Sequence, residues 1–187
     1  MKYVQKVWID FSNVTYDEFA EDYFSSFKSE IFGQVANAFN GTNVELTTED
    51  PVVGDFKRID VNNSFSIHPG IHGVADAYTG FLSIGNGHIN LQNIFDYCSE
   101  NGLDPQQGVT YIADVITHEI GHLMGLPHSD GDSSVMRAHP TEADWSQLPH
   151  FDQHELTQIN ASAVLANEHD DGSFDNTDGD FDDDEDV

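Results

Sequence analysis

The chain has 187 residues and a formal net charge of −28, with 34 acidic residues against six lysines and arginines. This acidic excess argues against nucleic acid as a partner, because phosphate binding needs a surface of lysine and arginine. The length fits one domain with a real hydrophobic core, no apolar run approaches the roughly 18 residues of a membrane span, and the single Cys98 excludes an internal disulfide framework. We expect Cys98 to be a small, half-buried apolar residue.

Strands and one long helix are predicted in the first half of the chain. Residues 6–11 are apolar and β-prone, and residues 16–39 place aromatic and aliphatic side chains three and four apart, which predicts an amphipathic helix. Further strands are predicted at 43–50, 56–62 and 87–95. This order predicts an α/β fold of the α+β type, in which the sheet is complete before the second long helix begins.

Two more helices and an acidic tail are predicted in the second half. Residues 108–124 carry an apolar stripe at helical spacing, and Asp152 is a candidate N-cap for a last helix over 152–167. From Glu168 to Val187 there are eleven acidic residues and no lysine or arginine, so we expect a tail that is disordered or calcium-responsive. The folded domain is therefore predicted over residues 1–167, with the tail over 168–187.

A glycine-rich segment separates the third and fourth predicted strands and contains several metal-ligating side chains. His72 and Asp76 lie in it, and His88 follows in the next strand. These three residues are candidates for a second metal site. An ordinary surface loop is the alternative, since glycines there need no more explanation than turns.

The stretch that begins at His118 reads HEIGHLMGLPH. Four residues advance an α-helix by about 400°, so His118 and His122 project within about 40° of each other and can bind one cation. Gly125 can end the helix in a left-handed conformation, and Pro127 prevents the helix from resuming. The turn brings His128 back toward the first two histidines, and three neutral imidazoles with an open fourth position are what a catalytic Zn²⁺ uses.

This stretch resembles the H-E-x-x-H-x-x-G-x-x-H signature of the metzincin zinc endopeptidases. The segment SSVMR places Met136 eight residues after His128, which is similar to the methionine turn of that family. The short gap, together with Ser129 directly after the third histidine, most resembles the matrixin branch. The resemblance implies a metzincin-like zincin catalytic domain, with a twisted mixed sheet, two long helices and a C-terminal helix.

The resemblance also implies a function. His118, His122 and His128 would bind Zn²⁺, and Met136 would support them from below. Glu119 would act as a general base in hydrolysing peptide bonds in proteins through a metal-activated water. The family's further ions make Ca²⁺ a second candidate cofactor.

Substrates would be proteins or peptides, and the enzyme would be a secreted or cell-surface monomer without a membrane span. In such enzymes an edge strand above the cleft pairs with extended substrate, and residues 87–92 are the candidate here. The alternative from a different class is a metal-binding adhesion or interaction domain of the same fold that is catalytically silent.

Overall fold

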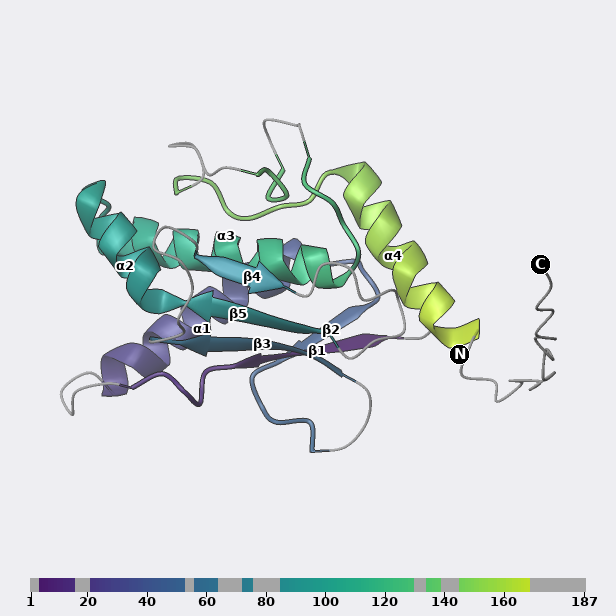
Figure 1. Cartoon of the computed structure of the whole chain (residues 1–187), viewed down its shortest axis with the longest axis horizontal. Helices are drawn as coiled ribbons and strands as arrows, with labels where there is room; N and C mark the ends of the chain where they lie inside the picture. Colours follow the sequence, from purple (N-terminus) through teal and green to yellow (C-terminus); the bar gives the residue numbers. More distant parts are fainter. Residues whose placement is uncertain are drawn as a thin grey trace, which may run out of the picture.

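One mixed five-stranded sheet forms a layer of the molecule beneath the long helices (Figure 1). This computed structural model describes residues 4–15, 21–52, 56–63, 72–75, 85–129, 134–138 and 145–168. The strands are β1 (Gln5–Asp10), β2 (Val44–Thr47), β3 (Phe56–Asn62), β4 (Gly73–Ala75) and β5 (Asn86–Asn90). Their order across the sheet is β2-β1-β3-β5-β4, all parallel except β4, which pairs antiparallel with β5 at the outer edge.

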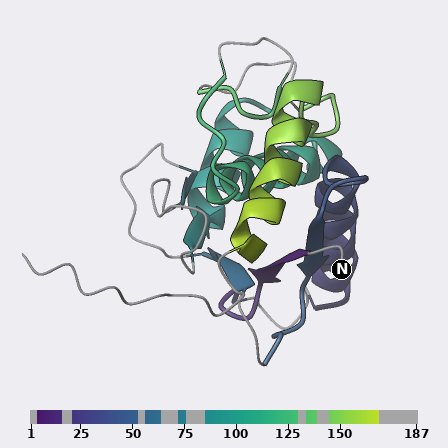
Figure 2. The same ribbon diagram turned by 90° about the vertical axis from the view of Figure 1, so that its right-hand side faces the viewer.

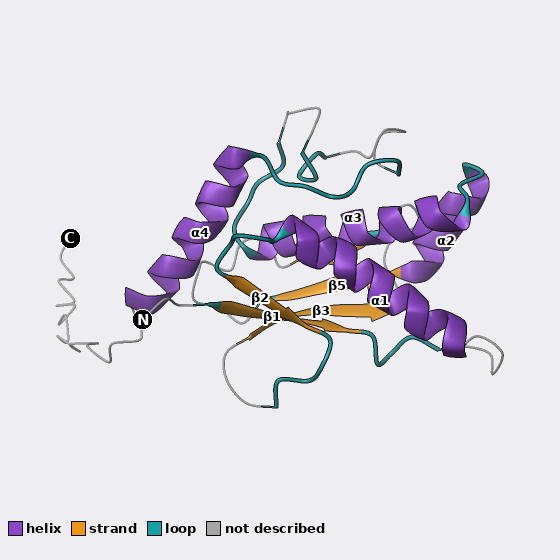
Figure 3. Cartoon of the chain, turned by 180° about the vertical axis from the view of Figure 1, so that it is seen from behind, coloured by secondary structure: helices purple, strands orange, loops and turns teal. Residues whose placement is uncertain are grey.

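Two long helices pack against each other on one face of this sheet (Figure 3). These two helices are α1 (Glu21–Ala38) and α3 (Pro105–Leu123), and the structure also has α2 (Leu91–Glu100) and α4 (Gln153–Glu168). Helix α3 contacts β3, β4 and β5, whereas α4 stands at one end of the molecule (Figure 1) and lies in front when that end faces the viewer (Figure 2). Within the described part of the chain, no helix is long and apolar enough to cross a membrane.

The core lies between the sheet and the helices α1 and α3. Alternate strand residues point toward the helices, so Ile9, Ile59 and Ile89 are fully buried. Ile112 and Ile116, one turn apart on α3, are fully buried against them. The core therefore fixes α3, the helix that carries HEIGH, against the sheet.

Two helices begin at capping boxes. In α3, Asp104 Oδ1 accepts a hydrogen bond from Gln107 N and Gln107 Oε1 accepts one from Asp104 N, each at 2.9 Å, so this helix starts earlier than residue 108, where the prediction placed it. In α4, Asp152 Oδ1 accepts from Glu155 N at 2.8 Å, which confirms Asp152 as the predicted cap. The prediction for α1 began at residue 16, but residues 16–20 lie outside the described residues, as does the tail beyond Glu168.

The strand predicted over 87–95 was wrong in its second half. β5 ends at Asn90, and Leu91 is the first residue of α2. The cause is an N-cap, since the Asn90 side chain accepts a hydrogen bond from Asn93 N at 3.1 Å. Ile94 is then buried on the inner face of a helix that the sequence reading did not predict.

The role of edge strand expected for residues 87–92 was also wrong. β4 pairs with β5 on its outer side through the registers Gly73 with Ile89 and Val74 with His88. The prediction missed β4, because a three-residue strand within a glycine-rich segment has too little alternation to be recognised. Cys98 was predicted to be a small, half-buried apolar residue, and the structure places this free thiol on α2 as a buried residue.

Candidate metal centre and active site

Three histidines converge at the C-terminal end of α3. His122 Nε2 lies 2.9 Å from His118 Nε2 and 3.1 Å from His128 Nε2. Three imidazole nitrogens bound to one Zn²⁺ at about 2.0–2.1 Å stand about 3.3 Å apart in a tetrahedral arrangement. Within the described part of the chain, a search for three or more His, Cys, Asp or Glu side chains that could share one metal ion finds His118, His122 and His128. The nitrogens therefore already stand close to the spacing that zinc requires.

The end of α3 directs His128 toward the other two histidines. Gly125 has a φ of +84°, which is the left-handed conformation that glycine adopts at little cost. Leu126 N donates to Gly121 O at 3.0 Å and Gly125 N donates to His122 O at 2.9 Å, which together form a Schellman motif. The helix therefore stops within one turn of His122, as the sequence predicted, and the chain turns back.

Backbone carbonyls fix the tautomers of the two helical histidines. His118 Nδ1 donates to Val135 O and His122 Nδ1 donates to Leu126 O, each at 2.8 Å, since a carbonyl oxygen can only accept. Both Nε2 atoms are then free to present a lone pair. Burial lowers the pKa of His118 to about 4 and also lowers that of His122, so both rings are neutral at pH 7. Neutral imidazoles with converging lone pairs are the donor set that zinc binds.

Glu119 is buried beside this group, with 5% of its surface exposed. Its side chain leaves α3 about 100° around the helix from His118 and lies beneath the edge strand β4. A Cβ built on Gly73 would stand 2.6 Å from Glu119 Oε1. Burial raises the pKa of Glu119 to about 8. Gly73 was not among the predicted site residues, although a glycine within a strand can signal such a close approach.

Met136 lies directly under the metal-binding end of α3 and is fully buried. A Cβ on Gly121 would overlap the Met136 sulfur, so this glycine lets the methionine reach the helix. Met136 O accepts a hydrogen bond from Ser129 N at 2.8 Å, which ties the methionine turn to the residue after His128. The turn thus lies where the sequence reading placed it.

A buried carboxylate holds the methionine turn against α4. Ser134 Oγ lies 2.7 and 2.6 Å from the two carboxylate oxygens of Glu155 and accepts a hydrogen bond from Met136 N at 2.9 Å. Glu155 also accepts from Asp152 N at 2.8 Å. The sequence reading found the Asp152 cap but missed this clamp, because the contact joins segments that are separate in the sequence.

Two residues of the candidate second metal site, His72 and His88, contact different partners. His72 Nδ1 lies 2.6 Å from Tyr111 Oη on α3, and His88 Nδ1 lies 3.6 Å from an Asp60 carboxylate oxygen on β3. Burial lowers the pKa of His72. Asp76 lies outside the described residues, so the second metal site stays a prediction.

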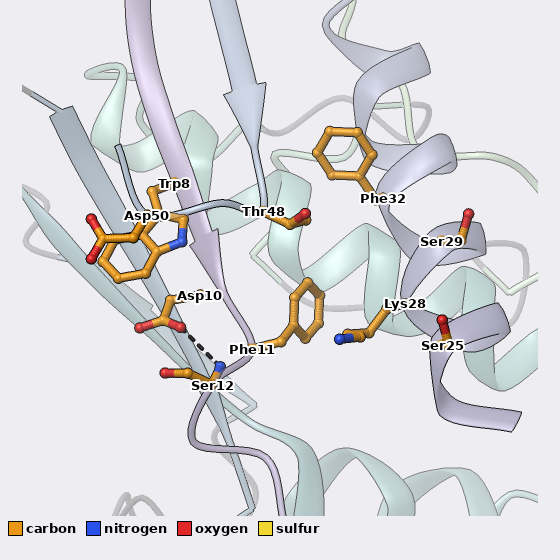
Figure 4. A pocket seen from close by; sticks show the side chains of 10 residues that line it. All are labelled: Trp8, Asp10, Phe11, Ser12, Ser25, Lys28, Ser29, Phe32, Thr48 and Asp50. Carbon is orange, nitrogen blue, oxygen red and sulfur yellow. Dashed lines mark hydrogen bonds between the residues drawn. The ribbon is translucent and has the colours of Figure 1, made fainter. Parts of the chain in front are cut away.

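A separate pocket of about 580 Å³ lies between α1 and the ends of β1 and β2 (Figure 4). Trp8 and Phe11 form one side of it, Lys28 and Phe32 of α1 form the other, and Asp50 follows β2. No histidine of the metal centre lines this pocket. The sequence patterns did not indicate it.

The sheet order, the long helix with His118 and His122, the returning His128 and the methionine beneath them define a zinc peptidase of the metzincin class. The sequence pattern of the matrixin family, described as Matrixin (Peptidase_M10), matches residues 4–161. The chain therefore belongs to the matrixin family of metallopeptidases, as the resemblance predicted.

Solved structures share the fold at low sequence identity. The archaemetzincin of Methanopyrus kandleri is 14% identical with a TM-score of 0.56, over 87% of this chain and 97% of that one. A zinc-dependent peptidase of Methanocorpusculum labreanum is 13% identical with a TM-score of 0.50, over 83% of this chain and 100% of that one. A comparison with curated proteins finds no match. At such identities the two structures support the fold, and the family assignment depends on the matrixin pattern.

Proposed function

We propose that this protein is a zinc-dependent endopeptidase that hydrolyses peptide bonds in proteins or peptides. The observation that carries the proposal is the convergence of three imidazole nitrogens, 2.9 and 3.1 Å apart, next to a buried glutamate. His118, His122 and His128 would hold the metal. Zn²⁺, when bound there, supplies Lewis acidity that lowers the pKa of water and polarises a carbonyl group.

Glu119 serves as the base and then as the acid in this proposal. Its burial raises its pKa to about 8 in the metal-free protein, and the positive charge of Zn²⁺ bound beside it would lower that pKa and favour the ionised carboxylate that accepts the proton. Glu119 takes one proton from the attacking water as the new C–O bond forms. It returns that proton to the nitrogen as the C–N bond breaks, so the amine leaves neutral and the glutamate is restored.

The edge strand β4 is the proposed docking strand for substrate. It is the last strand on its side of the sheet, and it lies over Glu119. An extended peptide that adds to an exposed sheet edge gains main-chain hydrogen bonds, while its alternate side chains face the enzyme. In this proposal β4 takes the role first expected for residues 87–92.

The test compares the parent protein with Glu119→Ala at matched zinc content on a quenched-peptide library. Removing a general base is expected to lower the rate by about 10²–10⁴-fold, while zinc binding by the three histidines persists. Cleavage by the parent that is lost in the variant supports the proposal. No cleavage by a zinc-loaded parent would contradict it and would favour a catalytically silent metal-binding domain of the same fold.

The proposal also covers the oligomeric state and the location of the enzyme. We propose a monomer that is secreted or held at the cell surface, and its support is membership of the matrixin family. Size-exclusion chromatography with light scattering tests the first part, and recovery of peptidase activity in culture medium or on washed cells tests the second. A calcium response of the tail over 168–187 is tested by deleting residues 170–187, which should abolish that response.

A further inference from the structure

Gly73 provides the space that the Glu119 side chain occupies. A Cβ at Gly73 would stand 2.6 Å from Glu119 Oε1, 2.7 Å from Cγ and 2.9 Å from Cδ. Real Cβ atoms essentially never approach other heavy atoms so closely, so an alanine at this position would force a displacement. The backbone of Gly73 lies outside the left-handed region, so alanine meets no conformational obstacle apart from Glu119.

The strand β4 is not free to move away from Glu119. Gly73 pairs with Ile89 in the sheet, and the preceding residue, His72, accepts a hydrogen bond from Asn90 N at 2.9 Å. The His72 ring lies 2.6 Å from Tyr111 Oη through its Nδ1 atom. These contacts hold β4 to both β5 and α3 at the residue next to Gly73.

The backbone of Glu119 is equally fixed, because it belongs to the buried helix α3. Its neighbour Ile120 is fully buried in the core, and His118 is hydrogen-bonded to Val135 O. The overlap would therefore be relieved at the Glu119 side chain. Rotation of that side chain changes where the carboxylate stands relative to the three histidines.

We propose that Gly73 is a positioning residue for Glu119, and that glycine is required at this point of β4 because the glutamate is held beneath it. This inference depends on the proposed function, since positioning matters for catalysis only if Glu119 transfers protons. It assigns β4 a second task beside the docking of substrate.

The first experiment measures kcat, KM and bound zinc for Gly73→Ala. We expect kcat to fall about 10–100-fold, because a displacement of about 1 Å in a catalytic group can cost that much. KM and zinc content should stay within about twofold, because the histidines and the outer edge of β4 do not change. Gly33→Ala on α1 is the matched control, since a Cβ there meets nothing within 4 Å.

The second experiment tests the contact between Gly73 and Glu119 without measuring activity, by a double-mutant cycle on Tm. Gly73→Ala should lower the Tm of the otherwise unchanged protein, whereas in a Glu119→Ala background, which lacks Cγ, Cδ and Oε1, it should lower the Tm much less. An equal loss of Tm in both backgrounds, or an unchanged kcat, would overturn the inference. If the parent is inactive, the proposed function fails, and the cycle still decides whether Gly73 positions the Glu119 side chain.

Discussion

Glu119→Gln should stabilise the metal-free protein at high pH while abolishing its peptidase activity. Glutamine has nearly the same shape as glutamate but cannot ionise, so the variant removes the charge and keeps the packing beneath Gly73. Glu119 is 5% exposed, and burial raises the pKa of its carboxyl group from 4.5 to about 8. Between these two values the folded state holds a proton on Glu119 that the unfolded state has lost.

The sign and size of the effect follow from this difference. Where the folded state binds more protons, the free energy of unfolding falls as pH rises, by about 1.4 kcal/mol per pH unit. Across the interval from 4.5 to about 8 the penalty grows to about 4–5 kcal/mol at most. Glutamine does not carry this penalty, so its advantage should be small near pH 5 and largest near pH 9.

Urea unfolding of the metal-free proteins at pH 5, 7 and 9 measures the difference directly. Glu45→Gln is the matched control, because Glu45 is an exposed glutamate on β2. Other titrating groups shift both proteins alike, so the comparison isolates Glu119. A stability difference between Glu119→Gln and the parent that is constant from pH 5 to 9 would refute the assignment of Glu119 as a desolvated carboxylate.

Three further substitutions test how the metal centre is built. Gly125→Ala should destabilise the protein by about 1 kcal/mol, because its φ of +84° disfavours alanine, and should weaken zinc binding by moving His128; thermal unfolding and competition with a chromogenic chelator measure the two effects. His128→Ala should reduce zinc affinity more than roughly 100-fold, because loss of a residue that only hydrogen-bonds to a metal ligand already costs roughly 10–100-fold. The Tm of the metal-free protein should stay nearly unchanged, because His128 is exposed. Ser134→Ala should cost about 1–3 kcal/mol in urea unfolding, because Glu155 and Met136 N each lose a buried partner, and an effect below 0.5 kcal/mol, roughly, would contradict the clamp.

The metal centre could be predicted because its geometry is local. His118 and His122 are separated by one helical turn, so their relative position follows from the pitch of an α-helix. Gly125 ends that helix in a conformation that its residue type already indicates. These features depend only on neighbours along the chain, and a sequence shows such neighbours directly.

The environment of Glu119 could not be predicted in the same way. Its burial is produced by β4, and β4 is held in place by pairing with β5 and by the contact of His72 with Tyr111. Nothing in the hydrophobic pattern of a glycine-rich segment reveals that it returns to a particular turn of α3. The wrong end of β5 has a different cause, because the side chain of Asn90 starts a helix within residues that also suit a strand.

The two halves of the site are supported by different parts of the chain. The ligand half is held by segments that follow α3, since His118 donates to Val135 O, and the methionine turn is clamped to Glu155 of α4. The base half is held by a segment that precedes α3, since Gly73 of β4 lies against Glu119. Damage to the clamp should therefore weaken zinc binding first, whereas damage at Gly73 should lower kcat while zinc remains bound. Because α3 itself is fixed by a core of fully buried side chains, either half can be perturbed without unfolding the other. A combined Ser134→Ala and Gly73→Ala variant should therefore show both the weaker zinc binding and the lower kcat, and the free-energy changes of the two substitutions should add.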